Sequence, residues 1–185
     1  VIPYCGRFLA RFPTLAALAA APVEQVMELW SGLGYYARAR NLHKAAGIVM
    51  AAHAGRFPDS VDTLGTLPGI GRSTAGAIAA IAYHVRAPIL DGNVKRVLAR
   101  YHGITGWPGE RKVQELLWQH AEQHTPHTEL VDYTQAIMDL GATLCTRAKP
   151  RCTACPMQGD CHAHNHDCVS QLPTSKPRKT LPVQT

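Results

Sequence analysis

The sequence predicts an all-α protein, and three observations support this fold class. Apolar residues recur at three- and four-residue spacing in six segments, several of these segments end in glycine, and the alternation of β-branched residues typical of strands is nearly absent. The six segments are residues 22–34, 35–55, 71–84, 92–103, 110–124 and 128–145. With 185 residues, of which 46% are hydrophobic and 17% charged, the chain can bury a sizeable core in about eight to ten short helices.

The first and last segments indicate part of a longer protein. Residues 1–12 open inside an amphipathic pattern with no capping residue before it, so we expect the chain to begin within a larger sequence. Cys5 in this segment is expected to be a small buried side chain. Residues 172–185 are rich in Pro, Lys and Thr and have no apolar face, which predicts a linker.

Charge and composition narrow the class of partner. Lys and Arg outnumber Asp and Glu by 19 to 13, giving a net charge of +6 and favouring a polyanion such as nucleic acid, although a basic surface without such a role is the alternative. Apolar runs are too short for a membrane span, and the sequence does not open on a signal peptide. We therefore expect a cytoplasmic protein that does not bind membranes.

The segment DTLGTLPGIGRSTAGAIAAI predicts two helices joined by a tight hairpin. Pro68 ends the first helix, Gly69 and Gly71 permit positive φ values, and the second helix begins at once. A phosphate oxygen can approach the glycine backbone closely and is attracted by the positive end of the helix dipole. An ordinary helical turn is the alternative interpretation.

Four cysteines with the spacing C-x6-C-x2-C-x5-C predict a metal site. They are Cys145, Cys152, Cys155 and Cys161. Four thiolates hold either zinc or an iron–sulfur cluster, and the spacing alone leaves both open. The first gap carries three cations, which are Arg147, Lys149 and Arg151. A short loop held at both ends by cysteines and carrying these charges is suited to contact the phosphates of DNA.

These motifs resemble those of a known superfamily. Residues 67–84 (LPGIGRSTAGAIAAIAYH), residues 90–100 (LDGNVKRVLAR) and the cysteine spacing resemble the endonuclease III-like, helix–hairpin–helix base-excision DNA glycosylases. Within that superfamily, WSGLGYYARARNLHKAA and DGNVKRVLARYHGITGWPG are similar to the A/G-specific adenine glycosylases, the MutY family. The resemblance runs from Val1 to about Cys161.

The resemblance implies a fold and a cofactor. It implies a six-helix-barrel module over residues 1–86, with the helix–hairpin–helix at about 62–80, and an iron–sulfur module over residues 87–168. Residues 169–185 then form a linker towards a C-terminal domain. The four cysteines are expected to hold a [4Fe–4S] cluster rather than zinc.

The resemblance also implies the reaction, which is hydrolysis of the N-glycosidic bond of adenine paired with 8-oxoguanine or guanine. Asp91 matches the carboxylate that stabilises the sugar cation, and Asn93 is expected to orient it. Asp91 can equally be the N-cap of the helix that follows, and the two roles are compatible. Ser73 stands where relatives with lyase activity have a lysine, so a monofunctional enzyme is expected, with Ser73 either supporting the transition state or simply starting a helix.

One catalytic group of the family is expected to lie upstream of Val1. The family's acid is a glutamate on the helix that precedes the VIPY segment, and Glu24 and Glu28 lie on a different helix of the match. We therefore expect the 185-residue chain by itself to be weak or inactive.

Substrate contacts are implied at four more positions. Tyr35, with Leu33 nearby, matches the wedge beside the oxidised guanine, whereas Tyr36 is expected in the core. Gln135 matches a residue facing the edge of the flipped adenine, and Met138 would pack against its ring. Core packing is the alternative for each of these side chains.

The expected partner is double-stranded DNA with adenine opposite 8-oxoguanine or guanine, bound by a monomer associated with a bacterial nucleoid. At the hairpin, Gly69, Gly71 and Arg72 are the expected DNA contacts. Two alternatives remain open, namely a thymine-mismatch glycosylase of the same superfamily and a DNA-binding module without enzymatic activity.

Overall fold

The computed structural model describes residues 2–177, except for the side chain of Ile2, and within that range it is all-helical. Ten α-helices are present there, which confirms the predicted fold class. The N-terminal helices are α1 (Ile2–Arg11), α2 (Leu15–Ala20), α3 (Val23–Trp30), α4 (Tyr36–Ala52), α5 (Val61–Gly65) and α6 (Arg72–Tyr83). The C-terminal helices are α7 (Gly92–Tyr101), α8 (Arg111–His124), α9 (Leu130–Asp139) and α10 (His162–Asn165), with a π-helical turn η1 (Leu140–Leu144) and a 3-10 turn η2 (Cys152–Ala154).

The packing divides the chain into two compact units, Val1–Ala75 and Gly76–Thr185. The division lies inside α6, earlier than the module boundary expected between residues 86 and 87. A close backbone approach explains the difference, because a Cβ atom on Gly76 would collide with the carbonyl oxygen of Pro88. The C-terminal part of α6 therefore packs with the segment that leads to α7.

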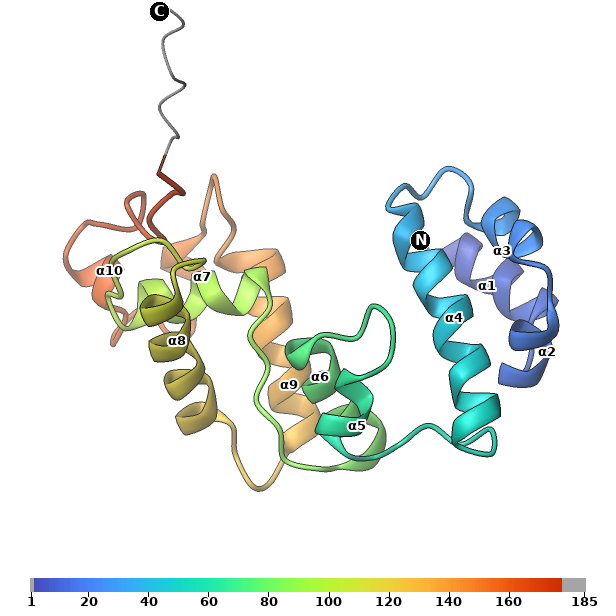
Figure 1. Cartoon of the computed structure of the whole chain (residues 1–185). Helices are drawn as coiled ribbons and strands as arrows, with labels where there is room; N and C mark the ends of the chain where they lie inside the picture. Colours follow the sequence, from blue (N-terminus) through green and yellow to red (C-terminus); the bar gives the residue numbers. More distant parts are fainter. Residues whose placement is uncertain (1, 178–185) are drawn as a thin grey trace, which may run out of the picture. The chain divides into compact units, whose positions relative to one another are not determined.

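In the first unit, α4 is the helix against which α2 and α3 pack (Figure 1). Its core consists of Phe12, Leu18, Val26, Ala39 and Ala46. Thr14 caps α2, with its hydroxyl oxygen 3.1 Å from the backbone nitrogen of Ala17. This unit carries the loop with Leu33 and Tyr35 and the hairpin before α6.

The face of α1 explains why the prediction for Cys5 is wrong. Tyr4 and Phe8 lie one turn apart on α1, and Phe12, directly after the helix, continues the same packed side. The rings of Phe8 and Phe12 meet edge to face, with their centroids 5.1 Å apart. Cys5 is one position away from Tyr4, about 100° around the helix, and is exposed.

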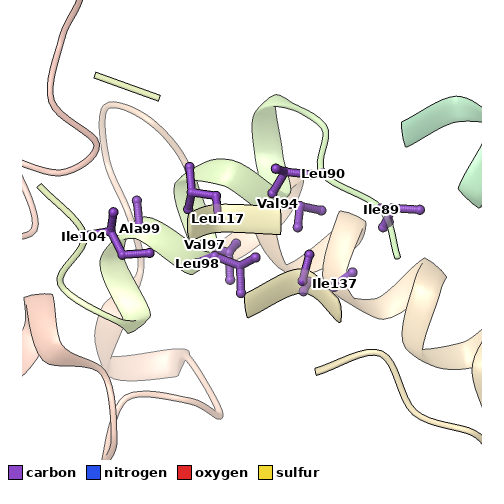
Figure 2. Packing of buried hydrophobic residues seen from close by; sticks show 10 residues of the cluster. Ile89, Leu90, Val94, Val97, Leu98, Ala99, Ile104, Leu117 and Ile137 are labelled. Carbon is purple, nitrogen blue, oxygen red and sulfur yellow. The ribbon is translucent and has the colours of Figure 1, made fainter. Parts of the chain in front are cut away.

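In the second unit, α7 supplies the central part of the core (Figure 2). Val94, Val97 and Leu98 pack with Leu117 of α8 and Ile137 of α9. Leu117 and Val94 are fully buried. Because α7 is held from several sides, the residues at its two ends have defined positions, and both ends bear candidate functional groups.

The start of the expected linker packs onto this second unit. Leu172 is buried, and its carbonyl oxygen accepts a hydrogen bond from Arg100 Nε at 2.9 Å. Ordered packing thus extends past residue 169, whereas residues 178–185 of the expected linker lie outside the described part of the chain. Between residues 2 and 177, none of the helices combines the length and apolar character needed to cross a membrane.

Candidate functional site

Asp91 is the N-cap of α7, as one of its two interpretations predicted. Its Oδ1 accepts a hydrogen bond from the backbone nitrogen of Val94 at 2.8 Å, and its backbone is extended. The side chain is half-buried. The cap fixes the carboxylate at the N-terminal end of the helix, a position in which a negative charge is stabilised by the helix dipole.

Asn93 is held by a neighbouring arginine on the same helix. Its Oδ1 accepts a hydrogen bond from Arg96 Nη2 at 2.8 Å. Arg96 also donates to the carbonyl oxygens of Gly141 at 2.6 Å and Cys145 at 2.7 Å. Burial lowers the pKa of Arg96. Through Arg96, the start of α7 is therefore connected to η1 and to the first cysteine of the metal-binding segment.

A second arginine of α7, Arg100, lies on the inner side of the cysteine segment. It is only 3% exposed. Its guanidinium donates to the carbonyl oxygens of Thr146 at 2.8 Å, Arg147 at 3.3 Å and Leu172 at 2.9 Å, and to Cys145 Sγ at 3.3 Å. A buried cation with these acceptors fixes the path of the cysteine segment.

The four predicted metal ligands lie around one cavity. Cys145, Cys152, Cys155 and Cys161 line it together with Arg100, and all four are free thiols. Burial, followed by the charges of Cys145 and Cys161, raises the pKa of Cys152. Cysteine thiols bind metal as thiolates, with release of protons, so this donor set fits a thiolate-bound iron–sulfur cluster or a zinc ion.

The three cations of the cysteine segment are exposed. Arg147 and Lys149 lie on the loop between Cys145 and Cys152. Arg151 is tied down more firmly, because its Nη2 donates to the carbonyl oxygen of Thr143 at 3.0 Å. This surface offers positive charge to a polyanion from a loop whose backbone is fixed by Arg100.

The hairpin before α6 belongs to the first unit. Gly69 has φ +80°, and a Cβ atom there would lie 2.8 Å from Cβ of Asn41, so the prediction for Gly69 is confirmed. The corresponding prediction for Gly71 is wrong, because its φ is not positive and a Cβ atom would meet nothing within 4 Å. The carbonyl of Gly71 instead starts α6 by accepting from Ala75 N at 2.9 Å.

Arg72 and Ser73 occupy the first turn of α6. Arg72 is exposed, and Ser73 is half-buried. Both side chains stand at the positive end of the helix dipole, where an anion is stabilised.

Tyr35 projects from the loop before α4. It has φ +49° and is 77% exposed, with the guanidinium of Arg38 5.1 Å from its ring centroid. This exposure excludes core packing for Tyr35, and the core prediction for Tyr36 is also wrong, since Tyr36 is 42% exposed. Leu33 is half-buried and lines an apolar pocket with Phe8 and other residues of the first unit.

Gln135 and Met138 lie on α9 with different surroundings. Gln135 is exposed, and its Nε2 donates to Asp139 Oδ1 at 3.0 Å, which excludes the interior position for this side chain. Met138 is partly buried against the core of the second unit. The amide of Gln135 is thus available at a surface, while Met138 connects that part of α9 to the core.

Sequence reasoning did not single out Arg96 and Arg100. They are four residues apart on α7 and therefore lie on the same face of the helix. This spacing could have indicated that the two arginines contact the same segment of the protein. Their target could not be inferred, because the cysteine segment begins 45 residues after Arg100 in the chain.

The fold and these sites define a class of protein: an all-helical protein with a helix–hairpin–helix segment, a capping aspartate after it and a four-cysteine segment. A family model described as "HhH-GPD superfamily base excision DNA repair protein" matches residues 1–123. The chain therefore belongs to the HhH-GPD superfamily of base excision DNA repair proteins.

Individual relatives agree with this assignment. The chain is 43% identical to an adenine DNA glycosylase of Buchnera aphidicola (Acyrthosiphon pisum), over 98% of the chain and 52% of the relative. It is 46% identical to the adenine DNA glycosylase of Rattus norvegicus, over 89% of the chain and 32% of the relative. The chain thus spans about half the length of its curated Buchnera relatives, and less of the mammalian ones.

Two solved structures share the fold. A thermostable thymine-DNA glycosylase has a TM-score of 0.78 and is 26% identical, covering 89% of the chain and 76% of that protein. A non-covalent endonuclease III–DNA complex has a TM-score of 0.75, also at 26% identity and the same coverage.

Proposed function

We propose that the protein is a DNA glycosylase of base excision repair that hydrolyses the N-glycosidic bond of adenine paired with 8-oxoguanine or guanine. The observation that carries the proposal is the 43% identity to an adenine DNA glycosylase over 98% of the chain. The thymine-DNA glycosylase has a similar fold but only 26% identity, so adenine is the favoured substrate. The proposed partner is duplex DNA, bound by a monomer.

In this proposal Asp91 stabilises the positive charge that develops on the sugar as adenine departs. The base first leaves the stack, since its sugar carbon is shielded in the duplex. The hydrogen bond from Val94 holds the carboxylate in one rotamer, which lowers the cost of placing it beside the sugar. Asn93 acts as a positioning residue, and its own position depends on Arg96.

Ser73 makes the proposed enzyme monofunctional. A Schiff base with the sugar requires an amine, which the hydroxyl of Ser73 cannot replace, so water is the nucleophile that attacks the sugar carbon. Borohydride treatment during the reaction is expected to trap no covalent DNA adduct. Efficient trapping at the rate of base release would contradict this part of the proposal.

The proposed DNA contacts fall into two groups. Phosphates are bound by the hairpin and the cysteine segment, and these residues are Gly69, Gly71, Arg72, Arg147, Lys149 and Arg151. Tyr35, with Leu33 nearby in the same loop, inserts beside the base opposite the adenine, because an exposed aromatic ring on a turn can stack between bases. Gln135 and Met138 contact the flipped adenine through its edge and its ring.

The proposed cofactor is a [4Fe–4S] cluster held by Cys145, Cys152, Cys155 and Cys161. When bound, the cluster would hold the four cysteines in fixed positions, so that the basic loop between Cys145 and Cys152 is fixed at both ends. Arg100 is the residue of this chain that positions the loop, through its hydrogen bonds to Thr146 and Arg147. Analysis of the purified protein should give four irons and four inorganic sulfides per chain, whereas stoichiometric zinc without iron would overturn this assignment.

The decisive experiment is a single-turnover assay of adenine release from a duplex with adenine opposite 8-oxoguanine. The 185-residue chain is compared with a chimera in which the glutamate-bearing segment of its adenine glycosylase relatives precedes Val1. We expect excision by the chimera, little by the chain alone, and loss of excision in Asp91→Asn. Equal rates for the chain and the chimera would refute the expected need for the upstream acid.

The control variant is Asp132→Asn, which alters an exposed aspartate in the first turn of α9 and should retain excision. Two outcomes would favour the alternatives. Release of thymine from a G·T duplex in place of adenine would favour the mismatch enzyme. Tight binding of every duplex without release of any base would favour a binding module.

A further inference from the structure

Three histidines of the second unit converge where α7 ends and α8 ends. His102 follows the last residue of α7, and His120 and His124 are one turn apart on α8. Each histidine offers one ring nitrogen, and these three atoms all lie within 4.8 Å of one another. His102 Nε2 and His124 Nε2 are 2.7 Å apart, and the rings of His102 and His120 stack at 3.8 Å.

Hydrogen bonding within the cluster leaves one buried polar atom without a partner. Nδ1 of His120 is buried and makes no hydrogen bond within the described part of the chain. Such an atom costs free energy unless it acquires a donor, a water or a cation. The imidazole of His102 is also neutral at pH 7, because burial, followed by the neighbouring His120 and His124, lowers its pKa to about 4. Burial likewise lowers the pKa of His124. Neutral imidazoles have the lone pairs that a metal requires.

We propose that His102, His120 and His124 form a binding site for a zinc ion, with water completing the coordination. Three imidazoles and one open position are an established zinc arrangement. With Zn–N bonds of 2.0–2.1 Å, ligand nitrogens in a tetrahedron are about 3.3 Å apart. In the structure, Nε2 of His102 and Nε2 of His124 are 2.7 Å apart, and the three ligand nitrogens all lie within 4.8 Å of one another. A modest rotation of the side chains is therefore sufficient to bring the nitrogens to the spacing that zinc requires.

The surroundings allow this rotation. His124 is exposed, and His102 and His120 are half-buried, so the rings are reached from solvent. Tyr101 packs its ring edge against His102 at 5.0 Å and against His124 at 5.9 Å, which closes one side of the cluster without adding a charge. The site is separate from the four cysteines and does not depend on the proposed glycosylase activity.

A bound ion would join the C-terminal end of α7 to the last two turns of α8. The three ligands come together only in the folded chain, so zinc binds the folded state and raises the free energy of unfolding. Above the dissociation constant, this increase grows with the logarithm of the ratio of the zinc concentration to the dissociation constant. Asp91 and Arg100 lie on the same α7, so a zinc ion would stabilise the helix that carries both residues.

The test is a titration of zinc into the untagged chain whose four cysteines already hold the cluster. Binding is measured by calorimetry, and the melting temperature is measured with and without zinc. We expect one tight equivalent and a higher melting temperature. His120→Gln and His124→Gln should each weaken binding by more than about tenfold, the lower end of what altered metal surroundings cost. His124 is exposed, so its replacement tests the site without disturbing the core.

Two control variants separate this site from other histidines. His166→Gln removes a histidine whose ring stacks on that of His162, and His53→Gln removes one at the end of α4. Both should bind zinc as the unaltered chain does. The proposal is overturned if His120→Gln and His124→Gln bind normally, or if His166→Gln abolishes binding. It is equally overturned if cobalt, used as a probe in place of zinc, shows only thiolate charge-transfer bands.

Discussion

Replacing Arg100 with methionine should strongly destabilise the second unit. Arg100 is 3% exposed, and its guanidinium donates to three carbonyl oxygens, so its removal leaves one buried and two part-buried acceptors without donors. Each unsatisfied buried polar group costs about 1–3 kcal/mol, and part of this is recovered where water enters. We expect a loss on the order of 3–5 kcal/mol, comparable to breaking a buried ion pair and a large share of the stability of a typical domain.

Urea unfolding followed by circular dichroism measures this loss, and the visible absorbance of the proposed cluster should disappear at lower urea concentration in the variant. Arg100→Lys keeps the charge without the planar fork and should give an intermediate loss. Arg111→Met is the matched control, because Arg111 is 92% exposed and should change stability by less than about 0.5 kcal/mol. A loss below about 1 kcal/mol for Arg100→Met would refute the importance assigned to these hydrogen bonds.

Two further predictions concern backbone strain and pH. Gly69→Ala should lower stability by about 1–2 kcal/mol and weaken DNA binding, because its φ is +80°. Gly71→Ala should leave the stability nearly unchanged, because its φ is not positive and a Cβ atom there meets nothing within 4 Å. Thermal melts of the two variants check this contrast in stability, and binding of Gly69→Ala to a short duplex checks the loss of affinity. Without zinc, the free energy of unfolding should fall as the pH is lowered from 6.5 towards 4, since the pKa of His102 is lowered to about 4 and the unfolded chain binds the proton first. His124, which faces His102 and whose pKa is also lowered by burial, adds to the fall. His102→Gln should therefore flatten the dependence of stability on pH in urea unfolding from pH 7 to 4, and the same dependence in this variant as in the unaltered chain would contradict the assignment.

Local features were predictable because they depend on neighbouring residues in the chain. The apolar periodicity of residues 92–103 predicts α7, and an aspartate directly before a helix predicts the cap that Asp91 forms with Val94. The positive φ of Gly69 follows similarly from the turn in which it lies. Gly71 shows the limit of this reasoning, because a glycine near a turn does not reveal which position needs the unusual backbone.

Exposure was harder to predict where two faces of a helix are both moderately apolar. Cys5 and Tyr36 were expected inside and are exposed, because the packed face of each helix is chosen by the neighbour that covers it. Gln135 and Met138 were left undecided for the same reason. The structure separates them, with Gln135 at the surface and Met138 against the core.

The sequence by itself determined the helical class, the cap of α7, the turn at Gly69 and the four thiols, since each follows from a short stretch of residues. Only the tertiary structure decided that Arg100 is buried and bonded to Leu172, 72 residues away. It also decided that His102 meets His124, 22 residues further along the chain. The physical reason is that the burial of a side chain, its pKa and the arrangement of metal ligands depend on atoms that tertiary packing brings together. The number of residues between two positions in the chain does not reveal whether packing brings them into contact.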